Sequence, residues 1–165
     1  MSKFTLMNKN KKIFDFEYND EDHVIVKFER NYPDNENYAP FGLIKDDNID
    51  KNQFNKWWKN RQIPASRNGL KDVLHKSNIY DKDNFDLLDA KAYCLSLSHH
   101  YLVKRVDEYI LREDINFFDN EFSEDIRKIL FDGGKTPIKL NLNTPDMTSN
   151  GNYEKRWKII DGDNT

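Results

Sequence analysis

The strongest constraint on the fold of this 165-residue chain is a regular alternation of residue types near its N-terminus. Along residues 13–18 every second residue is aromatic, and the residues between them are charged apart from one isoleucine: Phe14, Phe16 and Tyr18 alternate with Ile13, Asp15 and Glu17. Because side chains alternate across a strand, this pattern is typical of a sheet with one buried face. Residues 4–7 and 23–29 also have strand character, and turns rich in Asn and Asp separate the three segments. The sequence therefore predicts an N-terminal antiparallel β-hairpin or meander.

The spacing of apolar residues becomes helical after Asp50. Asp50 is suited to cap a helix, with Gln53 as its capping-box partner, and the helix should end near Arg61 because Pro64 follows. We expect Trp57 or Trp58 to anchor this helix on the core, and its cations to face solvent: Lys56, Lys59 and Arg61. Further helices are predicted over residues 66–77, 83–93 and 123–131, whereas 94–103 fits either a strand or a short helix.

The C-terminal residues have the pattern of an incomplete β-hairpin, with one strand and a turn. Residues 155–160 have strand character, and Asp161-Gly162 is a strong signal for a tight turn. We expect the chain to be a piece of something larger, with the edge at Trp157 and Ile159 docking a partner by strand addition. The predicted fold class is α+β, with an N-terminal subdomain over residues 1–140 and an incomplete hairpin over 141–165.

Composition argues against several functional classes. The net charge is -3, so the mixture of cations and aromatic rings over residues 56–71 is a weak basis for nucleic-acid binding. The single cysteine, Cys94, excludes a disulfide framework and is expected to be a buried thiol. No apolar run approaches the length of about 20 residues that spans a bilayer, and a cytoplasmic location is expected.

Familiar catalytic and metal-binding motifs are missing from the sequence. His99 and His100 are adjacent, so they point in different directions on a helix or a strand and cannot share a metal. The sequence contains no H-E-x-x-H, no G-x-S-x-G and no P-loop motif. Around Gly151, hydroxyl and amide residues precede a cationic strand, an arrangement that could approach phosphate oxygens but that is also ordinary turn chemistry.

Four ordered blocks of the chain are similar to the N-terminal part of HipA-like bacterial serine/threonine protein kinases: WWKNRQIPASR at 57–67, LSLS at 95–98, DINFFDNEFSED at 114–125 and TPDMTSNG at 144–151. The resemblance implies a two-lobed kinase related to toxin kinases. It also implies an ATP-phosphate loop formed by a short run of residues: Thr148, Ser149, Asn150, Gly151 and Lys155. Asn150 stands where the family usually has Asp.

In this family a Leu-Ile-Lys segment follows the Asp-Gly turn, and its lysine pairs with ATP phosphates, with the catalytic and metal-binding aspartates far downstream. This sequence does not contain that lysine segment or those aspartates. Because phosphoryl transfer depends on such groups, the resemblance implies that the chain alone is catalytically inactive. No cofactor is expected for the chain itself, and ATP-Mg would bind only if a downstream or separate kinase core completed the site.

Two functional interpretations remain open at this point. In the first, the chain is the N-terminal, non-catalytic portion of a HipA-like kinase and acts as a regulatory or docking subdomain. In the second, it is a free-standing protein-binding module derived from that region, such as an antitoxin-like or mobile-element-encoded protein. Both interpretations predict a protein partner, and neither predicts a membrane or nucleic-acid partner.

Overall fold

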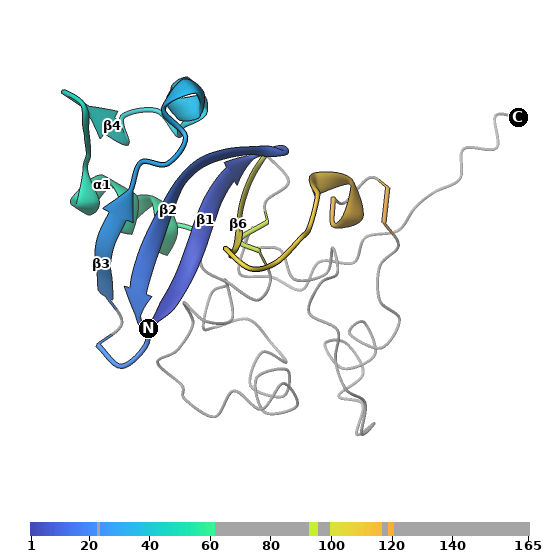
Figure 1. Ribbon diagram of the computed structural model, residues 1–165, viewed down its shortest axis with the longest axis horizontal. Helices are drawn as coiled ribbons and strands as arrows, with labels where there is room; N and C mark the ends of the chain where they lie inside the picture. The colour runs from blue at the N-terminus through green and yellow to red at the C-terminus, as the bar shows by residue number, and fades with distance from the viewer. Residues whose placement is uncertain (23, 62–92, 96–99, 117–118, 121–165) are drawn as a thin grey trace, which may run out of the picture.

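A four-stranded antiparallel sheet organises the part of the chain that the computed structural model describes, namely residues 1–22, 24–61, 93–95, 100–116 and 119–120 (Figure 1). Its strands, in the spatial order β3-β2-β1-β6, are β1 (Ser2–Asn8), β2 (Lys11–Asn19), β3 (Val24–Glu29) and β6 (Tyr101–Arg105). The predicted N-terminal meander is therefore confirmed. The sequence left residues 94–103 open between strand and helix, and β6 shows that their end is a strand pairing with β1.

Two register shifts change which residues face the core. One lies between Leu6 and Met7 of β1, opposite Ile13, and the other lies between Glu17 and Tyr18 of β2. An extra residue at a bulge disrupts the strict alternation of a strand. Ile13 is consequently buried in the same cluster as the aromatic residues of β2, so the prediction that it shares a face with Asp15 is wrong.

Helix α1 (Lys51–Lys59) covers one face of the sheet and completes an aromatic core. The carboxylate of Asp50 accepts hydrogen bonds from the backbone N–H groups of Asn52 and Gln53, which confirms the predicted N-cap. The Phe54 ring is fully buried, and Trp58 is buried beside it. Their ring centroids lie 5.0–6.2 Å from neighbouring aromatic rings that include those of Phe4, Phe14, Phe16, Tyr18 and Phe28.

The prediction that Arg61 faces solvent is wrong. It is only 5% exposed, and its guanidinium donates a hydrogen bond of 2.7 Å to the carbonyl of Cys94 and lies 4.4 Å from the Trp57 ring centroid. A longer contact of 3.5 Å reaches the carbonyl of Tyr101 at the start of β6. Arg61 therefore ties the end of α1 to two segments that are distant in sequence, whereas Lys56 is exposed as predicted.

Short elements of secondary structure form the connection between β3 and α1. A 3-10 helix, η1 (Pro33–Tyr38), is followed by a turn at Phe41-Gly42 and a small hairpin of β4 (Ile44–Lys45) and β5 (Asn48–Ile49). The hairpin turn is Asp46-Asp47, and both residues have positive φ angles, of 48° and 59°. A two-residue hairpin turn requires this conformation, which Asp tolerates better than most residues.

The predicted helices are only partly covered by the described residues. Among these residues α1 is the single α-helix, and η1 and η2 (Arg112–Asp114) are short 3-10 helices. The described part of the chain therefore has fewer helices than the sequence predicted for the whole. Tyr93, the predicted last residue of a helix, lies in a turn with a φ of 56°. The predicted helices over 66–77 and 123–131, the rest of 83–93 and the C-terminal hairpin over 141–165 lie outside the described residues.

Candidate functional site

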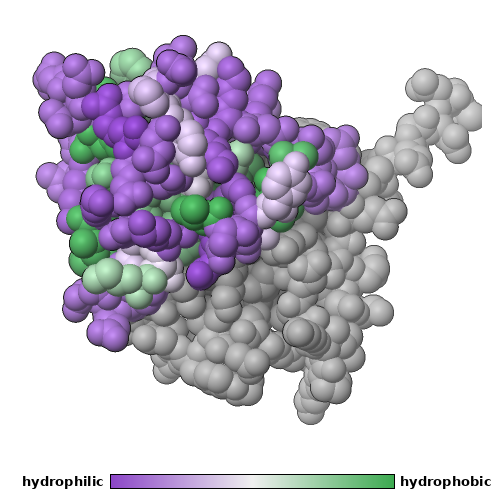
Figure 2. Space-filling view, in the orientation of Figure 1, coloured by the Kyte–Doolittle hydropathy of each residue, from purple (hydrophilic) through white to green (hydrophobic). Residues whose placement is uncertain are grey.

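The candidate site of the described region lies on the face of the sheet turned away from α1. This face is mostly hydrophilic, with small apolar patches (Figure 2). Close to β6 it bears a second, smaller core cluster of five buried residues with Ile110 packed against it: Met7, Tyr93, Leu95, Leu102 and Ile115. Cys94 is buried, as predicted, and it belongs to the aromatic core on the other face.

A polar row crosses the same face because of the strand register. Thr5 of β1 is paired with Lys104 of β6 on one side and with Asp15 of β2 on the other. The Thr5 hydroxyl donates a hydrogen bond of 2.6 Å to one carboxylate oxygen of Asp15. The other oxygen accepts hydrogen bonds from the Asn31 amide at 2.8 Å and the Tyr32 hydroxyl at 3.2 Å. Asp15 is thus buried with three donors around it, as buried carboxylates require.

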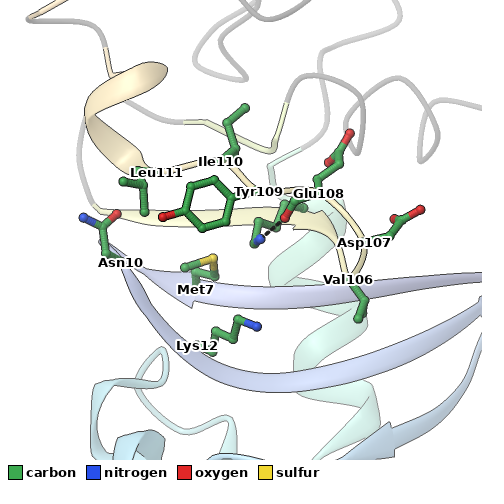
Figure 3. A pocket seen from close by; sticks show the side chains of 10 residues that line it. Met7, Asn10, Lys12, Val106, Asp107, Glu108, Tyr109, Ile110 and Leu111 are labelled. Atoms are coloured by element: carbon green, nitrogen blue, oxygen red, sulfur yellow. Dashed lines mark hydrogen bonds between the residues drawn. The ribbon is translucent and has the colours of Figure 1, made fainter.

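A pocket of about 350 Å³ opens beside this row, between the sheet and the loop that follows β6. Its lining combines apolar and polar side chains from both ends of the described sequence: Met7, Asn10, Lys12, Lys104, Val106, Asp107, Glu108, Tyr109, Ile110 and Leu111. In Figure 3 the ring of Tyr109 extends from the loop toward Leu111 and Asn10, while the carboxylate of Asp107 points away from the other lining side chains. We refer to this as the Lys104 pocket.

Lys104 is the least exposed cation of the pocket. It is 4% exposed, and its ammonium group donates a hydrogen bond to the backbone carbonyl of Glu108. Burial lowers the pKa of Lys104 below its ordinary value, and the nearby charge of Lys12 lowers it further, against the opposing influence of the Glu108, Asp15 and Asp107 carboxylates. Keeping Lys104 protonated in the folded chain therefore costs free energy.

The acidic residues of the loop are engaged elsewhere. The Glu108 carboxylate accepts a hydrogen bond of 3.1 Å from the backbone N–H of Arg105, and the Asp107 carboxylate lies 3.3 Å from the Arg105 guanidinium. Lys12 reaches toward the Tyr32 ring, with its ammonium 5.5 Å from the ring centroid. Within the described ranges neither Lys12 nor Lys104 forms an ion pair with a carboxylate.

The far wall of the pocket is fixed by Asn10, which lies in the turn between β1 and β2. Its side-chain carbonyl accepts a hydrogen bond of 2.8 Å from the backbone N–H of Arg112, and its amide donates one of 2.8 Å to the Glu113 carboxylate. The Asp114 carboxylate caps the same segment by accepting from the Leu111 N–H at 2.8 Å. These bonds therefore fix the C-terminal end of the loop over residues 106–111.

The site residues predicted from sequence are not those of the Lys104 pocket. The phosphate-loop residues Thr148, Ser149, Asn150, Gly151 and Lys155 and the docking residues Trp157 and Ile159 all lie outside the described residues, so those predictions stay predictions. Sequence reasoning missed the pocket because its two lysines are brought together only by the sheet. The one available signal was Lys104 itself, a cation that directly follows the apolar pair Leu102-Val103 in a strand.

Metal and membrane predictions concern the described residues only in part. His100 is largely exposed, and the slight desolvation of its ring, followed by the charges of Arg112 and Lys9, lowers its pKa. The described ranges contain no group of three or more His, Cys, Asp or Glu side chains that could hold a metal ion. In the same ranges no helix has the length and apolar character needed to cross a bilayer.

Comparisons with known proteins gave no guide to this chain. A scan against protein-family models, a search of curated proteins and a search of solved structures each returned no match.

Proposed function

We propose that this chain is the N-terminal, non-catalytic portion of a HipA-like serine/threonine kinase and that it acts as a docking or regulatory subdomain. The observation that carries the proposal is the position of the kinase-like residues that fall in the described region. Trp58 is in the aromatic core, and Arg61 is buried against the carbonyl of Cys94. Residues in such positions maintain a fold and do not react with substrates.

The third kinase-like block has the same character. Ile115 and Asn116 are buried, and the Asn116 amide donates a hydrogen bond of 2.6 Å to the Asp119 carboxylate. The Asn116 side-chain carbonyl accepts one of 2.9 Å from the Asp119 N–H. An Asn and an Asp that bind each other in this way shape a turn. This block therefore also supports a structural subdomain.

A docking role is supported by the edge of the sheet at β3. In the described sheet β3 has a neighbour on one side only, and Val24 and Val26 are each 47% exposed. An edge strand with exposed apolar side chains can accept an added strand from another polypeptide, with main-chain hydrogen bonds providing affinity. We propose that an extended segment of the kinase core pairs here, in addition to the docking proposed for Trp157 and Ile159.

The remaining parts of the kinase assignment belong to the same proposal. They are the helices between residues 62 and 140, the partial hairpin over 141–165 and an incomplete ATP-phosphate loop at Thr148–Gly151 with Lys155. ATP-Mg would bind tightly only when a kinase core completes this loop. The alternative function, a free-standing antitoxin-like module, would present the same sheet edge to a protein that is not part of its own polypeptide.

Two measurements test the proposal. The purified chain should incorporate no labelled phosphate from ATP, and it should bind a HipA-like kinase core that has been expressed without its own N-terminal region. Val24→Lys with Val26→Lys should weaken that binding, because charges at a sheet edge oppose strand addition. Lys51→Gln on the exposed side of α1 is the control and should bind as the unaltered chain does. Phosphate incorporation by the chain alone, or no binding to the core, would contradict the proposal.

Restoration of activity distinguishes the two candidate functions. A kinase subdomain should raise the phosphorylation rate of the isolated core when the two are mixed. An antitoxin-like module should bind the core and lower that rate.

A further inference from the structure

We propose that the Lys104 pocket binds a small organic oxyanion, a carboxylate or phosphate group on an apolar body, with Lys12 and Lys104 holding the anion. The inference goes beyond the proposed kinase assignment and does not depend on it. It rests on the charged groups and the lining of the pocket and on the hydrogen bonds that fix its loop.

The lining holds two lysines and two carboxylates, those of Asp107 and Glu108, so the case for an anion rests on how these groups are paired. Burial and then the charge of Lys12 lower the pKa of Lys104, and the Glu108, Asp15 and Asp107 carboxylates act in the opposite direction. In the described region neither Lys12 nor Lys104 forms an ion pair with a carboxylate. The Lys104 ammonium has one acceptor, the Glu108 carbonyl, although an ammonium group can donate three hydrogen bonds. An oxyanion between Lys12 and Lys104 would relieve the repulsion between their charges and accept hydrogen bonds from the remaining ammonium N–H groups.

The nearby carboxylates do not compete for this position. Glu108 and Asp107 line the pocket, but their carboxylates interact with Arg105, which does not line it. Asp15 lies in the same row of the sheet as Lys104, but its two oxygens already accept hydrogen bonds from Thr5, Asn31 and Tyr32. A site built to hold a cation would instead turn its carboxylates inward.

The rest of the lining fits an apolar body. Met7, Ile110 and Leu111 contribute aliphatic surface, and the exposed ring of Tyr109 provides an aromatic wall that a ligand could cover. A volume of about 350 Å³ is at the lower end of the range for small-molecule sites. The size therefore favours a single ring or a short chain attached to the anion over a nucleotide or a polymer.

The binding test uses three probes that share a benzene ring and differ in charge: benzoate, phenyl phosphate and neutral benzyl alcohol. Each is titrated into the full chain while NMR follows the amide resonances of Tyr109, Ile110 and Leu111 and the methyl resonances of Ile110 and Leu111. We expect at least one anion to shift these resonances with saturation, and benzyl alcohol to bind at least about tenfold more weakly, because it cannot form charge-assisted hydrogen bonds. Whichever anion binds more tightly identifies the headgroup as carboxylate or phosphate.

Substitutions then locate the anion. Lys12→Gln should weaken binding of the preferred anion about tenfold, because one charged donor is lost. Lys11→Gln is the matched control, since this neighbouring lysine is exposed and does not line the pocket, and it should leave the affinity unchanged. Lys104→Met should abolish saturable binding. If that variant does not fold, Lys12→Gln alone decides the question. Equal binding of benzyl alcohol and the anions, no saturable binding by either anion, or equal losses in Lys12→Gln and Lys11→Gln would overturn the proposal.

Discussion

Lys104 carries its charge in a place where charge is costly, and this has a measurable consequence. Burial and the charge of Lys12 lower the pKa of Lys104 from its ordinary value of 10.5. By contrast, the pKa of Lys27 is raised, chiefly by its hydrogen bond to Glu29. In an NMR titration of the lysine side chains we therefore expect Lys104 to lose its proton at lower pH than Lys27. Titration of Lys104 at or above the pH of Lys27 would contradict the buried position of this residue.

The same pKa shift predicts how stability changes with pH. The unfolded chain holds the Lys104 proton more tightly than the folded chain, so the contribution of Lys104 to stability rises as pH increases from its folded-state pKa toward 10.5. Lys104→Met removes this dependence. In urea denaturation, the stability of the unaltered chain relative to Lys104→Met should increase between neutral and alkaline pH. A constant or falling difference would show that Lys104 is not desolvated in the folded chain.

Phe54 tests the aromatic core at the scale of one side chain. Its ring is fully buried and lies 5.1–5.5 Å from the ring centroids of Phe14, Phe16 and Phe28. Phe54→Ala should lower the free energy of unfolding by about 3–5 kcal/mol in chemical denaturation. Phe41→Ala is the matched control, because Phe41 is fully exposed, and it should change stability by less than about 0.5 kcal/mol. Equal effects of the two substitutions would contradict the packing.

At the scale of elements, the hairpin that joins β1 and β2 stores backbone strain. Lys9 in its turn has a φ of 52°, a left-handed conformation that costs a residue with a side chain roughly 1–2 kcal/mol. Lys9→Gly should relieve part of this cost and stabilise the chain by about 0.5–1 kcal/mol. Lys11→Gly, at an ordinary strand position two residues on, should instead destabilise it. Thermal unfolding of both variants checks the prediction, and a loss of stability in Lys9→Gly would contradict it.

The elements that the sequence predicted correctly are those whose signals are local. The alternation in β2 and the cap at Asp50 depend on neighbours within a few residues, and both are confirmed. The misplaced residues depend on distant partners. Ile13 faces the core because a bulge pairs β2 unevenly with β1, and Arg61 is buried because Cys94 and Tyr101 supply acceptors for it.

The candidate site was less predictable than the fold for the same reason. The Lys104 pocket needs β6 beside β1, and the sequence left β6 undecided between strand and helix. The sheet register places Lys104 and Asp15 on either side of Thr5, and Asn10, about 100 residues earlier in the chain, bonds to the segment that follows the loop. The sequence-predicted phosphate loop around Gly151 depends on local chemistry, and it lies outside the described residues.

At the scale of the whole molecule, the sheet separates two roles. One face is closed by α1 over an aromatic core and provides stability. The opposite face carries the Lys104 pocket, and β3 forms an outer edge of the described sheet. This arrangement suits the proposed role of a non-catalytic subdomain.

Hydrogen exchange of the β3 amides tests docking most directly. Amides at a free sheet edge exchange quickly, and pairing with an added strand protects them. When the full chain is mixed with a HipA-like kinase core that lacks its own N-terminal region, we predict slower exchange in β3, residues Val24–Glu29, and unchanged exchange in the core helix α1. Binding of the core with no change in β3 would contradict docking at this edge, and no binding at all would contradict the proposed role of the chain.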